Sequence, residues 1–138
     1  MKQKLGKIIT SVVISGVLFN LALACNSGEE CFKKGFDLYN VGKYGLKSCE
    51  KFNYGKGCFG LGYLYEHGDG VQKDMNKALS YYKKAAPSEE KLCSSNDGQA
   101  CYELGYMYEH GYGVPKDPNK AKELYQKACK LKYEKGCK

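Results

Sequence analysis

Three serine–lysine pairs in the sequence have a spacing that could support acyl transfer. The S-x-x-K motif places a serine nucleophile one helical turn from a lysine, as in serine hydrolases that attack β-lactams. The three pairs are Ser48/Lys51, Ser80/Lys83 and Ser88/Lys91. Lysine is so frequent here that roughly one match is expected by chance, and the companion S-D-N and K-T-G elements are absent. The motif alone therefore indicates catalysis weakly, and the catalytic residues stay unknown.

Eight cysteines are the other residues that could carry chemistry. Structural zinc sites use C-x2–4-C pairs combined with a second pair or with histidines. No two cysteines in this chain lie that close, and the two histidines occupy positions far from most of them. The spacing therefore predicts no metal site and no cofactor, and it favours disulfides in an oxidising compartment.

An internal repeat positions most of these residues. Residues 58–86 align with residues 101–129 at an offset of 43, and 18 of the 29 positions are identical. The basic period is 36 residues, and the larger offset comes from seven extra residues at 87–93. A shorter, degenerate unit precedes the two copies, as terminal repeats of solenoids often do. We expect a signal peptide at 1–24, a degenerate repeat at 25–57, a repeat with its insertion at 58–100, and a last repeat with a C-terminal cap at 101–138.

Each unit has the pattern of two antiparallel helices. Apolar residues recur at helical spacing, Gly68 and Gly111 suit a left-handed helix end, and Asp74 and Asp117 suit an N-cap. Glycine inside the first helix of each unit predicts a close approach by a neighbouring helix. We therefore predict an all-α solenoid. Its helix pairs are 30–41 with 43–51, 58–67 with 75–86, and 101–110 with 118–130.

The repeat also predicts which cysteines pair. Cysteines eight or nine residues apart bracket each junction between a second helix and the next first helix. The seven-residue insertion restores this spacing before Cys101 through an extended or kinked second helix, and Pro87 favours a kink. The predicted disulfides are Cys49–Cys58, Cys93–Cys101 and Cys129–Cys137, with Cys25–Cys31 as a fourth.

The 13 tyrosines divide into two groups by their position in the repeat. Tyr65, Tyr82, Tyr108 and Tyr125 recur at core spacing. The tyrosines that fit the core pattern less well are our candidate binding residues. They are Tyr63, Tyr81, Tyr106 and Tyr112.

The first 24 residues have the features of an export signal. Lys2, Lys4 and Lys7 precede an uncharged apolar run that ends in Ala-Leu-Ala, a signal-peptidase pattern. Cleavage there predicts a secreted or periplasmic chain with no membrane span, although lipidation of Cys25 is an alternative. It also lowers the net charge from +7 to +4, and all the positive charges are lysine. The absence of arginine argues against a nucleic-acid partner.

The unit C-x-x-L-G-x-x-Y-E-x-G-x-G-V-x-K-D, with its 36-residue period, resembles the Sel1-like repeat, a relative of the tetratricopeptide repeat. Together with the C-x7-C junctions and the export signal, it resembles the Helicobacter cysteine-rich protein family. The resemblance implies a right-handed αα solenoid stapled at each junction by a disulfide. It also implies export, binding of penicillin-type ligands, and classification as a slow β-lactamase. The short first unit, Cys25, Cys31 and the insertion depart from that family.

Two functional hypotheses follow. The first is a monomeric, exported binding module whose concave surface takes a protein or peptide partner or a peptidoglycan-related fragment. The alternative is a β-lactamase that slowly hydrolyses penicillin-type β-lactams, and it rests on the family resemblance. If there is a nucleophile, Ser80 is the serine to test, because it lies on a well-defined predicted helix.

Overall fold

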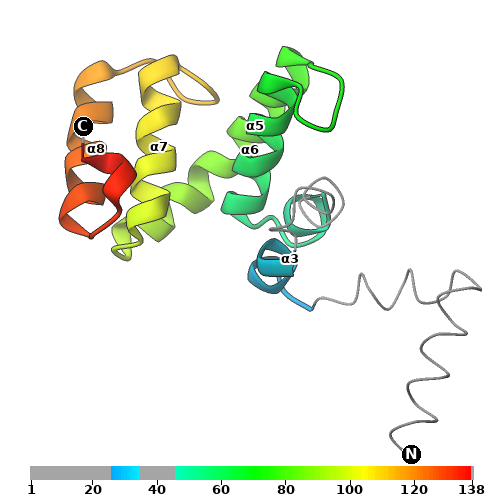
Figure 1. The fold of residues 1–138 in the computed structure, drawn as a ribbon, viewed down its shortest axis with the longest axis horizontal. Helices are drawn as coiled ribbons and strands as arrows, with labels where there is room; N and C mark the ends of the chain where they lie inside the picture. Colours follow the sequence, from blue (N-terminus) through cyan, green and yellow to red (C-terminus); the bar gives the residue numbers. More distant parts are fainter. Residues whose placement is uncertain (1–25, 35–45, 138) are drawn as a thin grey trace, which may run out of the picture.

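The computed structural model describes residues 26–34 and 46–137, which form helices and no strand (Figure 1). The elements in chain order are α3 (Gly28–Lys34), η1 (Lys47–Lys51), α5 (Gly55–His67), α6 (Met75–Ser94), α7 (Gly98–His110), α8 (Pro118–Lys130) and η2 (Glu134–Gly136). None of these helices has the length and apolar character needed to cross a membrane. The arrangement is an αα solenoid in which α5 packs on α6 and α7 packs on α8.

The two full helix pairs have the same end signals, as the repeat predicts. The first helix of each pair ends at a glycine in the left-handed region, Gly68 with φ 73° and Gly111 with φ 72°. The second helix begins after Asp74 or Asp117, whose side chain accepts the backbone N–H three residues later at 3.0 Å. These N-caps and helix ends confirm the sequence predictions.

The interior glycines mark the closest contact within each pair. A Cβ added to Gly62 would lie 2.8 Å from the Tyr82 ring, and one added to Gly105 would lie 2.9 Å from the Tyr125 ring. Real Cβ atoms are almost never this close to another side chain. Each glycine therefore gives a tyrosine of the second helix direct access to the backbone of the first helix.

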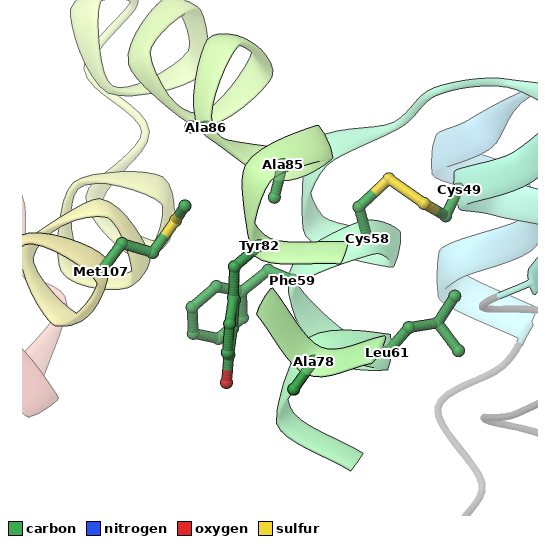
Figure 2. Packing of buried hydrophobic residues seen from close by; sticks show 9 residues of the cluster. All are labelled: Cys49, Cys58, Phe59, Leu61, Ala78, Tyr82, Ala85, Ala86 and Met107. Atoms are coloured by element: carbon green, nitrogen blue, oxygen red, sulfur yellow. A yellow bond between two sulfur atoms is a disulfide. The ribbon is translucent and has the colours of Figure 1, made fainter. Parts of the chain in front are cut away.

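Among the described residues, the buried apolar side chains of the two full helix pairs form two clusters. The first is shown in Figure 2, and its members are Cys49, Cys58, Phe59, Leu61, Ala78, Tyr82, Ala85, Ala86 and Met107. Met107 reaches into it from α7, so the cluster extends across the junction between the two pairs. The second cluster consists of Cys93, Ala100, Cys101, Leu104, Tyr108, Ala121, Tyr125 and Ala128.

Within residues 46–137, disulfides join successive helical elements at three places. The structure contains Cys49–Cys58, Cys93–Cys101 and Cys129–Cys137, with Cα–Cα distances of 4.6, 4.6 and 4.8 Å. These are the pairs that the repeat predicts. Cys31 is fully buried, but Cys25 lies outside the described residues, so the Cys25–Cys31 pair stays a prediction.

The insertion extends α6 instead of forming a separate loop. The predicted helix 75–86 continues through Pro87 to Ser94, eight residues beyond the predicted end. Two further turns carry Cys93 to Cys101, which keeps the C-x7-C junction intact. Proline in a helix interior removes one backbone hydrogen bond and bends the helix. Figure 1 shows the second half of α6 turning toward α7.

Helix α8 spans the predicted residues 118–130, whereas α5 and α7 differ from the predictions at their N-terminal ends. Helices α5 and α7 each begin three residues early, at Gly55 and Gly98 instead of at residues 58 and 101. Asp97 caps α7 by accepting the Ala100 N–H at 3.0 Å, and this explains the early start there. Of the predicted pair 30–41 and 43–51, the described parts are α3 and η1, and η1 is one π-helical turn.

Loss of the Cys93–Cys101 disulfide should lower stability substantially. The bond closes a loop with a sequence separation of 8 residues, and the chain-entropy model gives about 2.5 kcal/mol for a loop of this size. We expect the free energy of unfolding of the Cys93→Ser/Cys101→Ser double variant to be lower by that amount. The variant should therefore unfold at a lower urea concentration than the parent protein. Peptide mapping should show that the other two described disulfides are retained. A double variant as stable as the parent protein would contradict the prediction.

Candidate binding surface

The three serine–lysine pairs do not form a nucleophile–base pair. Ser48 is buried and donates from Oγ to the Gly28 carbonyl at 2.8 Å. The Oγ of Ser88 accepts the Gly55 N–H at 3.0 Å, so this hydroxyl anchors the N-terminus of α5. Ser80 is exposed on α6, beside a shallow hollow of about 570 Å³. Within the described ranges, no hydrogen bond joins any of these serines to the lysine of its motif.

A different set of side chains, on α5 and α7, forms a continuous aromatic surface. Each helix carries tyrosine and histidine four residues apart, which places both rings on one face. Tyr63 stacks on His67 with a centroid distance of 4.1 Å, and Tyr106 packs on His110 at 4.3 Å. The two tyrosine rings are 6.5 Å apart, so the two ring pairs are adjacent. These four residues and Tyr112 are called the aromatic surface below.

Tyr112 makes the surface different in the two helix pairs. It follows Gly111, and its ring stacks on His110 at 5.1 Å and on Tyr82 of α6 at 5.3 Å. The corresponding position after α5 is Asp69, so the first pair has no such ring. The aromatic surface therefore spans the junction between the two pairs.

Glu66 accepts hydrogen bonds from two tyrosines, one of which belongs to the aromatic surface. Its carboxylate accepts hydrogen bonds from the Tyr82 hydroxyl at 2.5 Å and from the Tyr106 hydroxyl at 2.9 Å. Burial and the hydrogen bond to Glu66 raise the pKa of both phenols above their ordinary value. Both phenols therefore stay neutral donors at physiological pH. One carboxylate thus fixes a tyrosine of its own pair and a tyrosine of the next.

Each histidine fixes its own ring in a similar way. The Nδ1 atom of His67 lies 3.0 Å from the Tyr63 carbonyl, and that of His110 lies 3.0 Å from the Tyr106 carbonyl. This geometry fits an N–H donor at Nδ1. The rings are therefore held in place before any partner arrives.

Only some of the four candidate binding tyrosines lie together. Tyr63, Tyr106 and Tyr112 belong to the aromatic surface, whereas Tyr81 stacks on Tyr65 at 5.7 Å in a separate contact. Tyr63 is 41% exposed, but the other three are half-buried. Tyr81, Tyr106 and Tyr112 also pack against the first core cluster, so they have a structural role besides any role in binding.

The contribution of the histidines and Glu66 to this surface was missed from the sequence. The available signal was the Y-x-x-E-H pattern, because positions three and four residues after a tyrosine lie on the same helix face. It occurs at 63–67 and again at 106–110. In our sequence interpretation the two histidines were considered only as possible metal ligands.

Comparison with protein families identifies the repeat. Residues 55–86 and 98–133 match the Sel1 repeat. These two segments are Sel1 repeats. The first corresponds to α5 with the first half of α6, and the second to α7, α8 and the start of the C-terminal turn. They are called the first and second repeat below.

Solved structures similar to this Sel1-repeat chain come from several bacteria. Cysteine-rich protein B of Helicobacter pylori is 42% identical over 69% of this chain and 65% of that protein, with a TM-score of 0.44. A Sel1 repeat protein from Oxalobacter formigenes is 33% identical over 75% and 42% of the two chains, with a TM-score of 0.45.

A protective antigen of uropathogenic Escherichia coli with the same type of repeat is 27% identical over 79% of this chain and 22% of that one, with a TM-score of 0.46. The chain thus spans between 22% and 65% of the length of these three proteins. No curated protein matches the chain at a significant level.

Proposed function

We propose that this chain is an exported binding module whose aromatic surface takes a protein or peptide partner. Sel1-repeat proteins commonly bind proteins. The observation that carries the proposal is the run of five rings across the two repeats, with Tyr63 41% exposed at its edge.

The physical chemistry of the aromatic surface suits protein recognition. Tyrosine offers a large apolar area with a polar tip and loses little conformational entropy on binding. The rings of Tyr106 and His110 are already fixed by Glu66 and by the Tyr106 carbonyl. A partner therefore meets a preorganised surface, which reduces the free energy spent on ordering side chains.

The disulfides support an extracytoplasmic location. Disulfides persist in secreted and periplasmic proteins and are rare in the cytosol, and three of them staple the described part of this chain. This agrees with the export signal predicted for residues 1–24. The choice between a soluble chain and a lipoprotein anchored through Cys25 falls on residues outside the described ranges.

The part of the chain that the structure describes contains no feature that favours β-lactam hydrolysis. Acyl transfer requires a nucleophile, a base and oxyanion donors at one place. Two of the candidate serines are engaged with backbone groups, and Ser80 lies in the middle of α6, where the backbone N–H groups serve the helix. We therefore propose binding alone, with peptidoglycan-related fragments as a ligand class for the same surface.

Tyr63→Ala should weaken partner binding with little loss of stability. Truncating an aromatic anchor in an interface commonly lowers affinity about tenfold or more. Tyr63 is 41% exposed, so its removal should change the free energy of unfolding by only about 0.5 kcal/mol. Envelope proteins are first captured on the immobilised, oxidised chain. The affinity of each captured protein for the parent chain and for the variant is then measured by titration.

Tyr81→Ala is the matched control, because it removes the same side chain outside the aromatic surface. A partner that binds the parent and the Tyr81 variant, but not the Tyr63 variant, supports the proposal. Loss of binding in the Tyr81 variant with full binding in the Tyr63 variant would place the interface elsewhere.

A further inference from the structure

A buried group of ionisable side chains lies where α5, α6 and α7 meet. Glu89 of α6 is 0% exposed, Glu103 of α7 is 6% exposed and Lys56 of α5 is 9% exposed. Glutamate and lysine are rarely buried to this extent without direct partners. This acidic junction, defined as Lys56, Glu89, Asp97 and Glu103, has no part in the aromatic surface.

The hydrogen bonds at the acidic junction leave its carboxyl groups incompletely satisfied. Lys56 Nζ bonds to Asp97 Oδ2 at 2.6 Å and to Gln99 Oε1 at 3.5 Å. The Gln99 amide donates to Glu103 Oε1 at 2.8 Å. Both carboxyl oxygens of Glu89 and the Oε2 of Glu103 are buried without a hydrogen-bond partner. The one ammonium group is therefore directed at Asp97 instead of at the two glutamates.

Both glutamates reach this junction through departures from the repeat. Glu89 belongs to the seven-residue insertion, and the bond from the Gly55 N–H to Ser88 holds this turn of α6 against the start of α5. A Cβ on Gly55 would lie 2.5 Å from Glu89 Oε1, so glycine provides the necessary space. Glu103 stands where the first repeat has Gly60.

Two buried carboxyl groups beside each other cannot both ionise at low cost. Burial raises the pKa of Glu89, and the neighbouring Glu103 raises it further, against the opposing effect of Lys56. Burial also raises the pKa of Glu103, although the hydrogen bond from Gln99 and the charge of Lys56 act in the opposite direction. The two groups titrate as a pair, and the pair keeps a proton at a pH where exposed glutamates have lost theirs.

We propose that the Glu89–Glu103 pair is a protonation-controlled lock on the junction between the two Sel1 repeats. With a proton on the pair, one carboxyl group donates to the other and the junction is closed. When the proton leaves, two buried carboxylates face each other and the turn of α6 that carries Glu89 loosens from α5 and α7, while the Cys93–Cys101 disulfide still joins the two helices. The lock would make the relative position of the two repeats sensitive to pH.

Three other ionisable groups around the lock, Asp97, Tyr54 and Tyr133, keep their charge state over the same range. Burial raises the pKa of Asp97, but the hydrogen bond from Lys56 and the backbone N–H of Ala100 outweigh this, so its pKa is lowered and it stays ionised. Burial and the surrounding carboxylates raise the pKa of Tyr54 to about 12 and raise that of Tyr133, so both phenols stay neutral. The charge of Glu29 also contributes to the raised pKa of Tyr54.

The direction of the pH effect follows from the raised pKa values. Below the ordinary glutamate pKa of 4.5, the pair is protonated in both the folded and the unfolded chain. In this range a change of pH therefore does not alter stability through the pair, and the closed junction has its full stability. As the pH rises above this value, the unfolded chain loses protons that the folded chain still holds. The closed junction therefore becomes less stable with increasing pH until the folded pair itself has ionised.

Hydrogen exchange of the intact, oxidised chain at pH 5.5 and pH 8.5 tests the lock. After correction for the intrinsic exchange rate, protection of the amides at 88–104 should fall at least tenfold between the two values. Protection in α8 should fall much less. In Glu89→Gln the drop at 88–104 should shrink to less than threefold, because the neutral amide cannot ionise. The matched control is Glu123→Gln, which removes an exposed carboxylate of α8 and should behave as the parent.

Glu103→Gln provides a second test that does not depend on how Glu89→Gln folds, and it should also shrink the drop. An equal loss of protection at 88–104 and in α8 would overturn the lock, since pH would then act on global stability. A parent protein whose protection at 88–104 is the same at both pH values would overturn it as well. So would a Glu89 variant that keeps the full tenfold drop.

Discussion

Gly113→Ala is expected to destabilise the fold by about 3 kcal/mol. Gly113 has a φ of 72°, where an alanine costs about 1 kcal/mol of backbone strain. A Cβ at this position would also lie 2.5 Å from the Lys83 nitrogen and 2.6 Å from the Tyr82 carbonyl carbon. Backbone atoms of a helix cannot rotate away, so the loop that carries Tyr112 would have to move off α6, at a further cost of about 2 kcal/mol.

Gly70→Ala is a matched control provided by the repeat itself. Gly70 occupies the equivalent position in the first repeat and has a φ of 69°, but nothing lies within 4 Å of its added Cβ. It should therefore show only the strain, about 1 kcal/mol. Urea unfolding of the two variants separates the two contributions. Equal losses of stability would mean that the loop adapts and that the contact with α6 is unimportant.

The sequence predicted the architecture well because the repeat constrains many positions at once. Two copies with the same caps, end glycines and core tyrosines must adopt one structure, and Asp74, Asp117, Gly68 and Gly111 behave as predicted. The cysteine spacing identified the three pairs for the same reason. Some helix boundaries were less accurate, since Gly55 and Gly98 lie in helices but fall before the predicted ranges 58–67 and 101–110.

The parts that differ between the copies were harder to predict. The sequence allowed an extended or a kinked α6, and Pro87 favoured the kink. In the structure α6 continues through Pro87 to Ser94, and its second half turns toward α7 (Figure 1). The buried position of Glu89 depends on contacts with α5, a helix that precedes it by more than 20 residues. Glu103 did carry a signal, because it falls among the buried positions of α7 between Ala100 and Met107.

For the aromatic surface, too, the sequence predicted some features and not others. The sequence identified Tyr63, Tyr106 and Tyr112 as candidate binding residues, and the structure places them together. It could not separate Tyr81 from them, because neighbouring tyrosines on α6 differ only in which face of the helix they occupy. Tyr82 is fully buried, whereas Tyr81 contacts Tyr65 and the Lys84 ammonium, whose Nζ is 5.8 Å from the ring centroid.

Tyr82→Ala should destabilise the chain by about 4 kcal/mol, the typical cost of removing a fully buried aromatic side chain. The Tyr82 ring is 0% exposed and lies 5.3 Å from the rings of both Phe59 and Tyr112. Its ring also fills the space that Gly62 leaves open. Truncation therefore creates a cavity at the point where the two repeats meet.

Tyr82→Phe keeps the ring and removes only the hydroxyl that donates to Glu66. It should cost about 1.5 kcal/mol, the typical loss for a hydrogen bond to a charged group. Urea unfolding of the oxidised parent and both variants at pH 6 gives the two free energies. If the alanine variant loses no more stability than the phenylalanine variant, the packing of the ring contributes little. In that case the stability of the repeat junction depends mainly on the shared Glu66 carboxylate, which also accepts the Tyr106 hydroxyl.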